Sequence, residues 1–255
     1  MKRVLTAAVL IPVVLGLIFW APTRSVRWCL ALLALLCLSE FLKLAAHYDA
    51  QPMRLVAYLA GAWTVAGDVS APFFLGITLL LLTLAMRSGG MPGAAATLLG
   101  IIYIAMPFRL AADLHRASPH WLFYALLINW IGDSAAYYAG RAFGRHKLAP
   151  AISPGKTWEG AVASLLISVP LATLYLRHFL PHALVFSLAL SAAANVAAQA
   201  GDLAESALKR GAGVKDSGTL LPGHGGLLDR LDGVLFSVPV VWLAALLGAA
   251  AREHR

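Results

Sequence analysis

The chain has 255 residues, of which 60% are hydrophobic and 13% charged, and its mean hydropathy is +0.77. This composition excludes an ordinary soluble domain, in which roughly 45–50% of residues are apolar. The formal net charge is +8, but the basic residues lie in short loops between apolar runs, so we expect them to orient the chain in a membrane and to hold anions, and we expect no nucleic-acid partner.

Apolar runs bounded by charged residues, proline or glycine predict about nine transmembrane helices, because a helix of about 20 apolar residues crosses the hydrocarbon core. The expected ranges are 4–20, 28–46, 54–68, 72–87, 93–111, 121–140, 159–178, 182–200 and 233–250. Helices are expected because lipid-exposed backbone must satisfy its own hydrogen bonds. The predicted fold is an all-α polytopic integral membrane protein, with N-terminal transmembrane helices over 1–120 and a catalytic transmembrane region over 121–255.

The loops predict the orientation of these helices. Nine spans with the N-terminus inside place the even-numbered loops in the cytoplasm, and the larger share of the Lys and Arg residues falls on that side. The two longest polar stretches, 141–158 and 201–232, also fall there. We therefore expect one active site that faces the cytoplasm and draws on both stretches.

Glu40 is a carboxylate within the second apolar run, where a charge is costly and often functional. Lys43 follows three residues later, which is a pairing distance on a helix. We prefer a structural ion pair between the two to a catalytic role for Glu40.

A first polar region begins in the sixth predicted span with Asp133 and closes over residues 153–160. Within it, Gly155-Lys156-Thr157 resembles the end of a nucleotide-binding P-loop. That motif would require glycine where the chain has Pro150, so the P-loop interpretation fails.

What remains of this region is a Ser-Pro turn that leads into a helix. Thr157 or Ser153 could cap that helix, and Glu159 falls in its first turn. Capping alone could explain Ser153 and Glu159, but it leaves Lys156 unexplained, because a cation at a helix start opposes the helix dipole. A phosphate bound there would explain it.

The second and densest polar region runs from Gly201 to Gly233. Its first part should be helical, and the spacing of Asp202, Ser206 and Lys209 then places a carboxylate, a hydroxyl and an ammonium group along one face. Such a face can hold a cation and a phosphate together.

A glycine-rich loop follows over 211–226 and carries Lys215, Asp216 and His224. Glycine permits close backbone approach, so its N–H groups could converge on phosphate oxygens. The chain then re-enters a helix, where we expect Asp229 and Asp232 on one face as oxygen ligands for Mg²⁺. A merely solvated connecting loop is the alternative, but connections of that kind need few residues.

The segment from Ser206 to Asp232 resembles the signature of the phosphatidate cytidylyltransferase (CDP-diacylglycerol synthase) family. It reads Ser206-Ala-Leu-Lys-Arg, four residues, Lys215-Asp-Ser-Gly, two residues, Leu221-Pro-Gly-His-Gly-Gly-Leu-Leu-Asp-Arg-Leu-Asp232. The stretch from Asp133 to Gly160 is similar to the family's other polar region. The first hundred residues match the family only in their hydrophobic character.

The resemblance implies a metal site formed by Asp202, Asp229 and Asp232. It implies a substrate site for the CTP triphosphate and the phosphatidate head group, formed by Asp133, Ser153, Lys156, Thr157, Glu159, Lys209, Arg210, Lys215 and Arg230. The implied catalytic set is Asp202, Ser206, Lys209, Lys215, Asp216, His224, Asp229, Arg230 and Asp232.

The implied reaction joins CTP to phosphatidic acid and releases diphosphate, with Mg²⁺ as cofactor and K⁺ as a candidate second cation. The implied location is a bacterial inner membrane, with lipid around the chain and a homodimer through lipid-facing helices as a further expectation. Two alternatives stay open: a CTP-dependent kinase or cytidylyltransferase for another lipid acceptor, and a transporter of anionic solutes.

Overall fold

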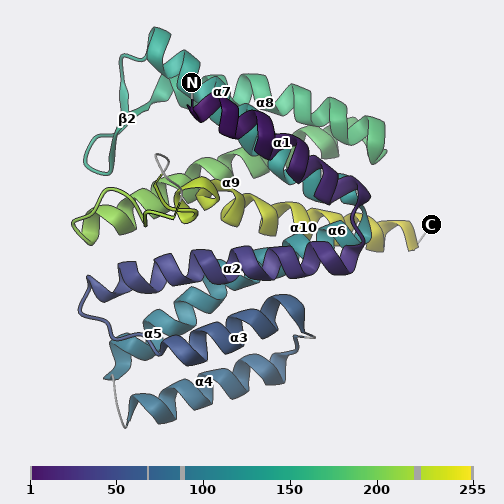
Figure 1. Ribbon diagram of the computed structural model, residues 1–255. Coiled ribbons are helices and arrows are strands. Elements are labelled where there is room, and N and C mark those ends of the chain that lie inside the picture. The colour runs from purple at the N-terminus through teal and green to yellow at the C-terminus, as the bar shows by residue number, and fades with distance from the viewer. Residues whose placement is uncertain (1, 68, 87–89, 221–224, 254–255) are drawn as a thin grey trace. The chain divides into compact units, whose positions relative to one another are not determined.

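Figure 1 presents the computed structural model of the chain, which describes residues 2–67, 69–86, 90–220 and 225–253. Most of the described chain is helical. The helices are α1 (Lys2–Trp20), α2 (Thr23–Ala46), α3 (Arg54–Ala66), α4 (Ala71–Ala85), α5 (Gly90–Gly100), α6 (Met106–Ala117), α7 (Pro119–Phe143), α8 (Trp158–Phe179), α9 (Leu184–Gly211) and α10 (Asp232–Glu253). The predicted all-α class is confirmed.

Each predicted apolar run corresponds to helix in the structure, although the ends differ. The run expected over 93–111 is a longer helix, because α5 and α6 are joined by a π-helical turn at Ile101–Ala105. Within the described residues, four helices are long and apolar enough to cross a membrane: Thr23–Ala46, Gly90–Ala117, Trp158–Phe179 and Leu184–Gly211. The chain is therefore a helical membrane protein, while nine spans remain a prediction.

A short β-hairpin between α7 and α8 was not expected. Strand β1 (Lys147–Ala149) pairs antiparallel with β2 (Ser153–Thr157), with Lys147 opposite Thr157 and Ala149 opposite Ser153. The predicted Ser-Pro turn is thus extended strand. The hairpin places Lys156 one residue before Thr157, the N-cap of α8.

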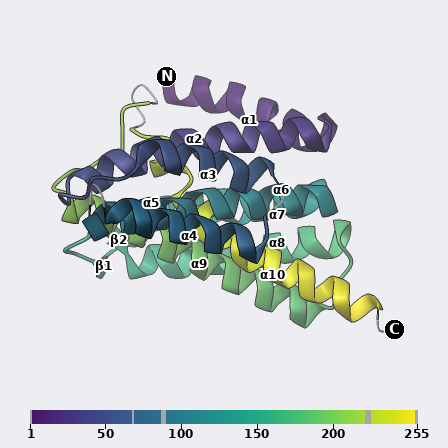
Figure 2. The same cartoon turned by 90° about the horizontal axis from the view of Figure 1, so that it is seen from below.

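The chain divides into two compact units. The first consists of Met1–Arg116 and Gly211–Arg230, and the second of Ala117–Arg210 and Leu231–Arg255. In the first unit α2 and α3 run side by side, and α2 also contacts α5 (Figures 1 and 2). Leu38 and Leu42 of α2 and Ile104 of the π-helical turn are fully buried there.

In the second unit α7 packs along α8, and α10 also packs against α7. The close approach of α7 and α8 depends on small residues. A Cβ on Gly160 would lie 2.8 Å from the Ala136 carbonyl oxygen and 3.5 Å from the Gly140 Cα. Small residues at such a crossing let helix backbones approach closely, as they do in membrane proteins generally.

Candidate active site

The start of α8 is organised by the end of the hairpin. The Thr157 hydroxyl accepts the Gly160 N–H at 3.2 Å, which confirms a threonine cap at this helix start. Ser153 instead lies in β2 opposite Ala149, so it is not the N-cap. Glu159 accepts the backbone N–H of His146, whose ring nitrogen Nδ1 also lies 2.7 Å from Glu159 Oε1. His146 was not predicted, and it holds the hairpin against the first turn of α8.

Lys156 and Asp202 form an ion pair, with 2.7 Å between the lysine Nζ and the carboxylate Oδ2. The two residues come from different polar regions of the sequence, since Lys156 lies on β2 and Asp202 on α9. Ser206, one turn after Asp202, donates its hydroxyl to Asp202 Oδ1 at 3.4 Å. A predicted phosphate ligand and a predicted metal ligand are therefore in direct contact.

Two more carboxylates add negative charge near Asp202. Asp232, the first residue of α10, lies within electrostatic range of the Asp202 and Asp133 carboxylates and of the Lys209 ammonium group. Its Oδ1 accepts the N–H of Gly233 at 2.7 Å. Like charges held close together favour a bound cation, which would relieve the repulsion.

No three Asp, Glu, His or Cys side chains within the described ranges lie close enough together to form a complete protein cage for a metal ion. Mg²⁺ is commonly held in proteins by one or two carboxylates together with water and substrate phosphates.

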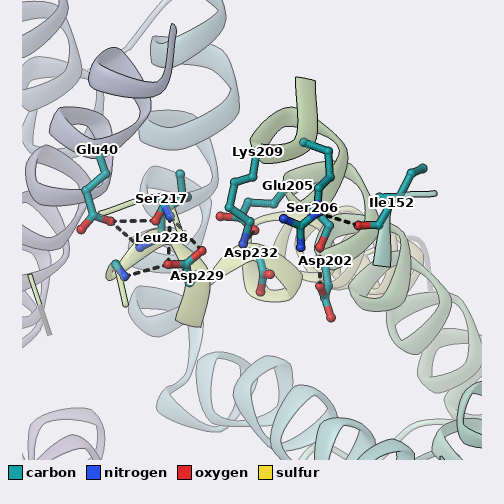
Figure 3. A network of polar contacts seen from close by, with 12 residues as sticks. Glu40, Ile152, Asp202, Glu205, Ser206, Lys209, Ser217, Leu228, Asp229 and Asp232 are labelled. Carbon is teal, nitrogen blue, oxygen red and sulfur yellow. Dashed lines mark hydrogen bonds and ion pairs between the residues drawn. The ribbon is translucent and has the colours of Figure 1, made fainter. Parts of the chain in front are cut away.

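The end of α9 carries two cations in different settings. Lys209 is almost buried and pairs with the fully buried Glu205, which was not predicted although its spacing of four residues is a standard helical pair (Figure 3). Arg210 is exposed, and its Nε donates to the Ile152 carbonyl oxygen at 3.2 Å. Arg210 therefore ties α9 to the hairpin.

The glycine-rich loop belongs to the first unit. N–H groups of this segment were predicted to converge on phosphate oxygens. In the structure, several of them converge instead on the protein's own carboxylates. Asp229 accepts the N–H of Ser217 at 3.1 Å and that of Gly226 at 2.7 Å. Glu40 accepts the N–H groups of Leu227 and Leu228, at 3.1 and 2.8 Å (Figure 3). These four amides are therefore already hydrogen-bonded and are not available to bind a phosphate.

The predicted ion pair between Glu40 and Lys43 is wrong. Glu40 is 3% exposed and turns to the loop, whereas Lys43 is exposed, and no ion pair joins them in the part of the chain that is described. The backbone amides and a hydroxyl satisfy the carboxylate better than a lysine that would have to leave water.

The sequence predicted that Asp229 and Asp232 share one continuous helix, and this prediction is wrong. Asp229 lies in the 3₁₀ turn Leu228–Arg230, and a new helix begins at Asp232. Lys215, Asp216 and Arg230 are exposed. Gly213 and Gly225 adopt positive φ values of 72° and 80°, a conformation that glycine allows. His224 lies outside the described residues.

A buried polar network in the second unit also escaped prediction. Asn195 of α9 donates to the hydroxyls of Ser164 and Ser168 on α8, at 2.9 Å each, and Gln199 donates to Asn195 Oδ1 at 2.7 Å. Gln199 further donates to the Ala161 carbonyl oxygen at 3.3 Å. The sequence signal that could have revealed the network is the pair of side-chain amides, Asn195 and Gln199, four residues apart in an apolar run. The network fixes α9 against α8, one turn from Asp202.

Comparison with known proteins adds a family match. A model described as the cytidylyltransferase family matches residues 1–247.

Individual relatives carry the name phosphatidate cytidylyltransferase. The protein from Staphylococcus aureus (strain COL) is 42% identical over 150 residues, which are 58% of this chain and 57% of that protein. The Bacillus subtilis (strain 168) protein is 43% identical over 148 residues, 56% of this chain and 55% of the relative. The Staphylococcus saprophyticus protein is 37% identical over 187 residues, 71% of each. The matched part of the chain thus spans a little over half the length of the first two relatives.

Proposed function

The chain belongs to the cytidylyltransferase family, and from this premise we propose that it is a phosphatidate cytidylyltransferase, which converts CTP and phosphatidate to CDP-diacylglycerol and diphosphate. The names of its relatives support phosphatidate as the acceptor. The observation that carries the proposal is the contact between Lys156 and Asp202, a cation and a carboxylate from two separate polar regions.

In the proposed reaction, a phosphate oxygen of phosphatidate attacks the α-phosphorus of CTP. The bond from that phosphorus to the oxygen bridging the α- and β-phosphates breaks, and diphosphate leaves with the bonding electrons. A phosphate monoester is already ionised near neutral pH, so no base has to activate it and no covalent enzyme intermediate is needed. Positioning and charge stabilisation supply the rate.

Mg²⁺, when bound with the nucleotide, would neutralise phosphate charge and stabilise the leaving diphosphate. Asp202 and Asp232 are the proposed ligands, because their mutual repulsion favours a cation. Asp229 stays a proposed ligand in spite of its amide contacts, since the two oxygens of a carboxylate together offer about four acceptor sites. K⁺ is the proposed second cation.

Basic side chains complete the proposed substrate site. Lys156 is paired with Asp202, and the CTP triphosphate would offer the ammonium group a more highly charged partner. The other proposed phosphate ligands are Lys209, Arg210, Lys215 and Arg230, with Ser206 and His224 as polar contacts.

A membrane location suits this chemistry, because the acyl chains of substrate and product can stay in the bilayer while CTP arrives from water. We place the site at the cytoplasmic face of a bacterial inner membrane, in a chain that forms homodimers. The charge distribution of the loops supports that orientation.

The test is transfer of label from [α-³²P]CTP to the lipid phase by the purified chain in detergent, with phosphatidate and Mg²⁺. We expect lipid-extractable label that requires both additions and falls on the order of a hundredfold in Asp202→Asn. Label formed with diacylglycerol or a polyprenol, but not with phosphatidate, would overturn the assignment of the acceptor. Label that forms equally well in Asp202→Asn would overturn the assignment of the site.

A further inference from the structure

Glu40 is an acidic residue buried in the otherwise apolar helix α2, in the half of the chain where the sequence carries little chemistry. Burying a carboxylate is costly unless hydrogen-bond donors replace water. Among the described residues, the hydrogen-bond partners of Glu40 are Ser217, Leu227 and Leu228, which lie in the segment that bears the family's signature residues. The buried Glu40 carboxyl group therefore obtains its hydrogen bonds from that segment.

The contacts of Glu40 indicate its role. Its Oε1 accepts the Leu227 N–H, and its Oε2 accepts the Leu228 N–H and the Ser217 hydroxyl, the last at 3.3 Å (Figure 3). A backbone N–H can only donate, so both oxygens of Glu40 act as hydrogen-bond acceptors. A side chain 3% exposed and surrounded in this way does not reach a substrate.

Two glycines of the loop pack directly against the Glu40 carboxylate. A Cβ on Gly226 would lie 2.7 Å from Oε2 and would overlap the Ser217 hydroxyl. A Cβ on Gly218 would overlap Oε1 and would lie 2.8 Å from the carboxyl carbon. Glycine is thus required at both positions by the approach of Glu40.

Glu40 and Asp229 hold the same short stretches of loop. Ser217 gives its hydroxyl to Glu40 and its N–H to Asp229, while Gly226 donates to Asp229 just before Leu227 and Leu228 donate to Glu40. Loss of the Glu40 acceptors would release Ser217 and the Leu227–Leu228 stretch at once. The conformation of Asp229 then depends on Glu40 through their shared partner Ser217.

We propose that Glu40 is a positioning residue for catalysis, a buried carboxyl group that fixes residues 215–220 and 225–230 in the conformation that presents Asp229 and its neighbours. This inference rests on the proposed function for its effect on rate, and on the contacts above for its effect on the loop. The inference gives the N-terminal helices a role in the active site, which was not predicted from the sequence.

The test compares Glu40→Gln with Lys43→Gln, a control one turn away on the exposed side of the same helix. Glutamine keeps the shape but presents an NH₂ group to backbone N–H donors. Hydrogen–deuterium exchange of the full chain in detergent should speed up in peptides containing Ser217 and Leu227–Leu228, with α3 and α8 unchanged. The kcat should fall roughly tenfold or more with little change in the KM for CTP, and Lys43→Gln should match wild type in both assays.

Glu40→Gln with wild-type exchange in the loop and wild-type kcat would overturn the proposal. Faster exchange throughout the chain, with activity lost in proportion to unfolding, would also overturn it, because Glu40 would then serve stability alone. If Glu40→Gln does not fold, Ser217→Ala decides: faster exchange confined to the loop with a lower kcat supports the proposal, and wild-type values in both overturn it. The exchange assay needs no substrate, so a wrong acceptor assignment would leave it intact.

Discussion

The Lys156 Nζ lies 2.7 Å from Asp202 Oδ2, and this contact joins strand β2 to helix α9 across 46 residues of sequence. Both side chains are partly exposed, at 24% and 38%, so the pair contributes little to stability. Its significance is that it brings a cation of one polar region into contact with a carboxylate of the other.

Replacement of Lys156 by glutamine should weaken the binding of CTP. A hydrogen bond to a charged group contributes about 1.5–3 kcal/mol, so the KM for CTP should rise roughly tenfold or more. Lys147→Gln is the matched control, because Lys147 is an exposed lysine on the neighbouring strand. Steady-state kinetics with labelled CTP measures both variants, and equal KM values for wild type and Lys156→Gln would contradict the assignment.

Asparagine at Asp202 or Asp232 should raise the Mg²⁺ concentration needed for half-maximal activity, because each change removes a proposed ligand charge. We expect a shift of about tenfold or more, the size found when groups that support metal sites are lost. Asp49→Asn is the control, since Asp49 is exposed with φ of 55°, a conformation that asparagine also tolerates. Mg²⁺ titration of the transfer assay gives the midpoints. A midpoint unchanged in both variants would remove them from the metal site.

Alanine at Gly160 should destabilise the contact of α7 with α8, because the added Cβ would meet the Ala136 carbonyl oxygen at 2.8 Å. Overpacking of this kind costs about 1–3 kcal/mol. Gly155→Ala in the nearby hairpin is the control, since no atom lies within 4 Å of its added Cβ. Thermal unfolding in detergent should show a lower midpoint for Gly160→Ala alone, and equal midpoints would show that the helices can move apart freely.

Alanine at Asn195 should also lower stability, because it leaves Ser164, Ser168 and Gln199 without a shared partner. Hydrogen bonds between membrane helices contribute about 0.6 kcal/mol each, up to about 1.7, so the loss should be about 1–2 kcal/mol. Val196→Ala, at the next and 54% exposed position, should have a much smaller effect. The measurement is thermal unfolding, and identical midpoints for the two variants would mean that the network is dispensable.

Several local features could be predicted from the sequence because they depend on short-range spacing. The positions of the helices follow from the apolar runs, the alignment of Asp202 with Ser206 follows from the helical period, and the threonine cap follows from the residue types before α8. The β-hairpin was missed, because a Ser-Pro-Gly stretch also fits an irregular turn. The single helix through Asp229 and Asp232 was wrong, because periodicity does not reveal where a 3₁₀ turn interrupts a helix.

The sequence by itself determined the helical membrane class and the two polar regions that carry the chemistry, since hydropathy and motif spacing are properties of neighbouring residues. Only the tertiary structure decided which groups meet. It paired Lys156 with Asp202, and it turned the loop amides toward Glu40 and Asp229. The reason is physical: a buried carboxylate takes whichever donors the folded backbone brings to it, and Leu228 is 188 residues from Glu40 along the chain.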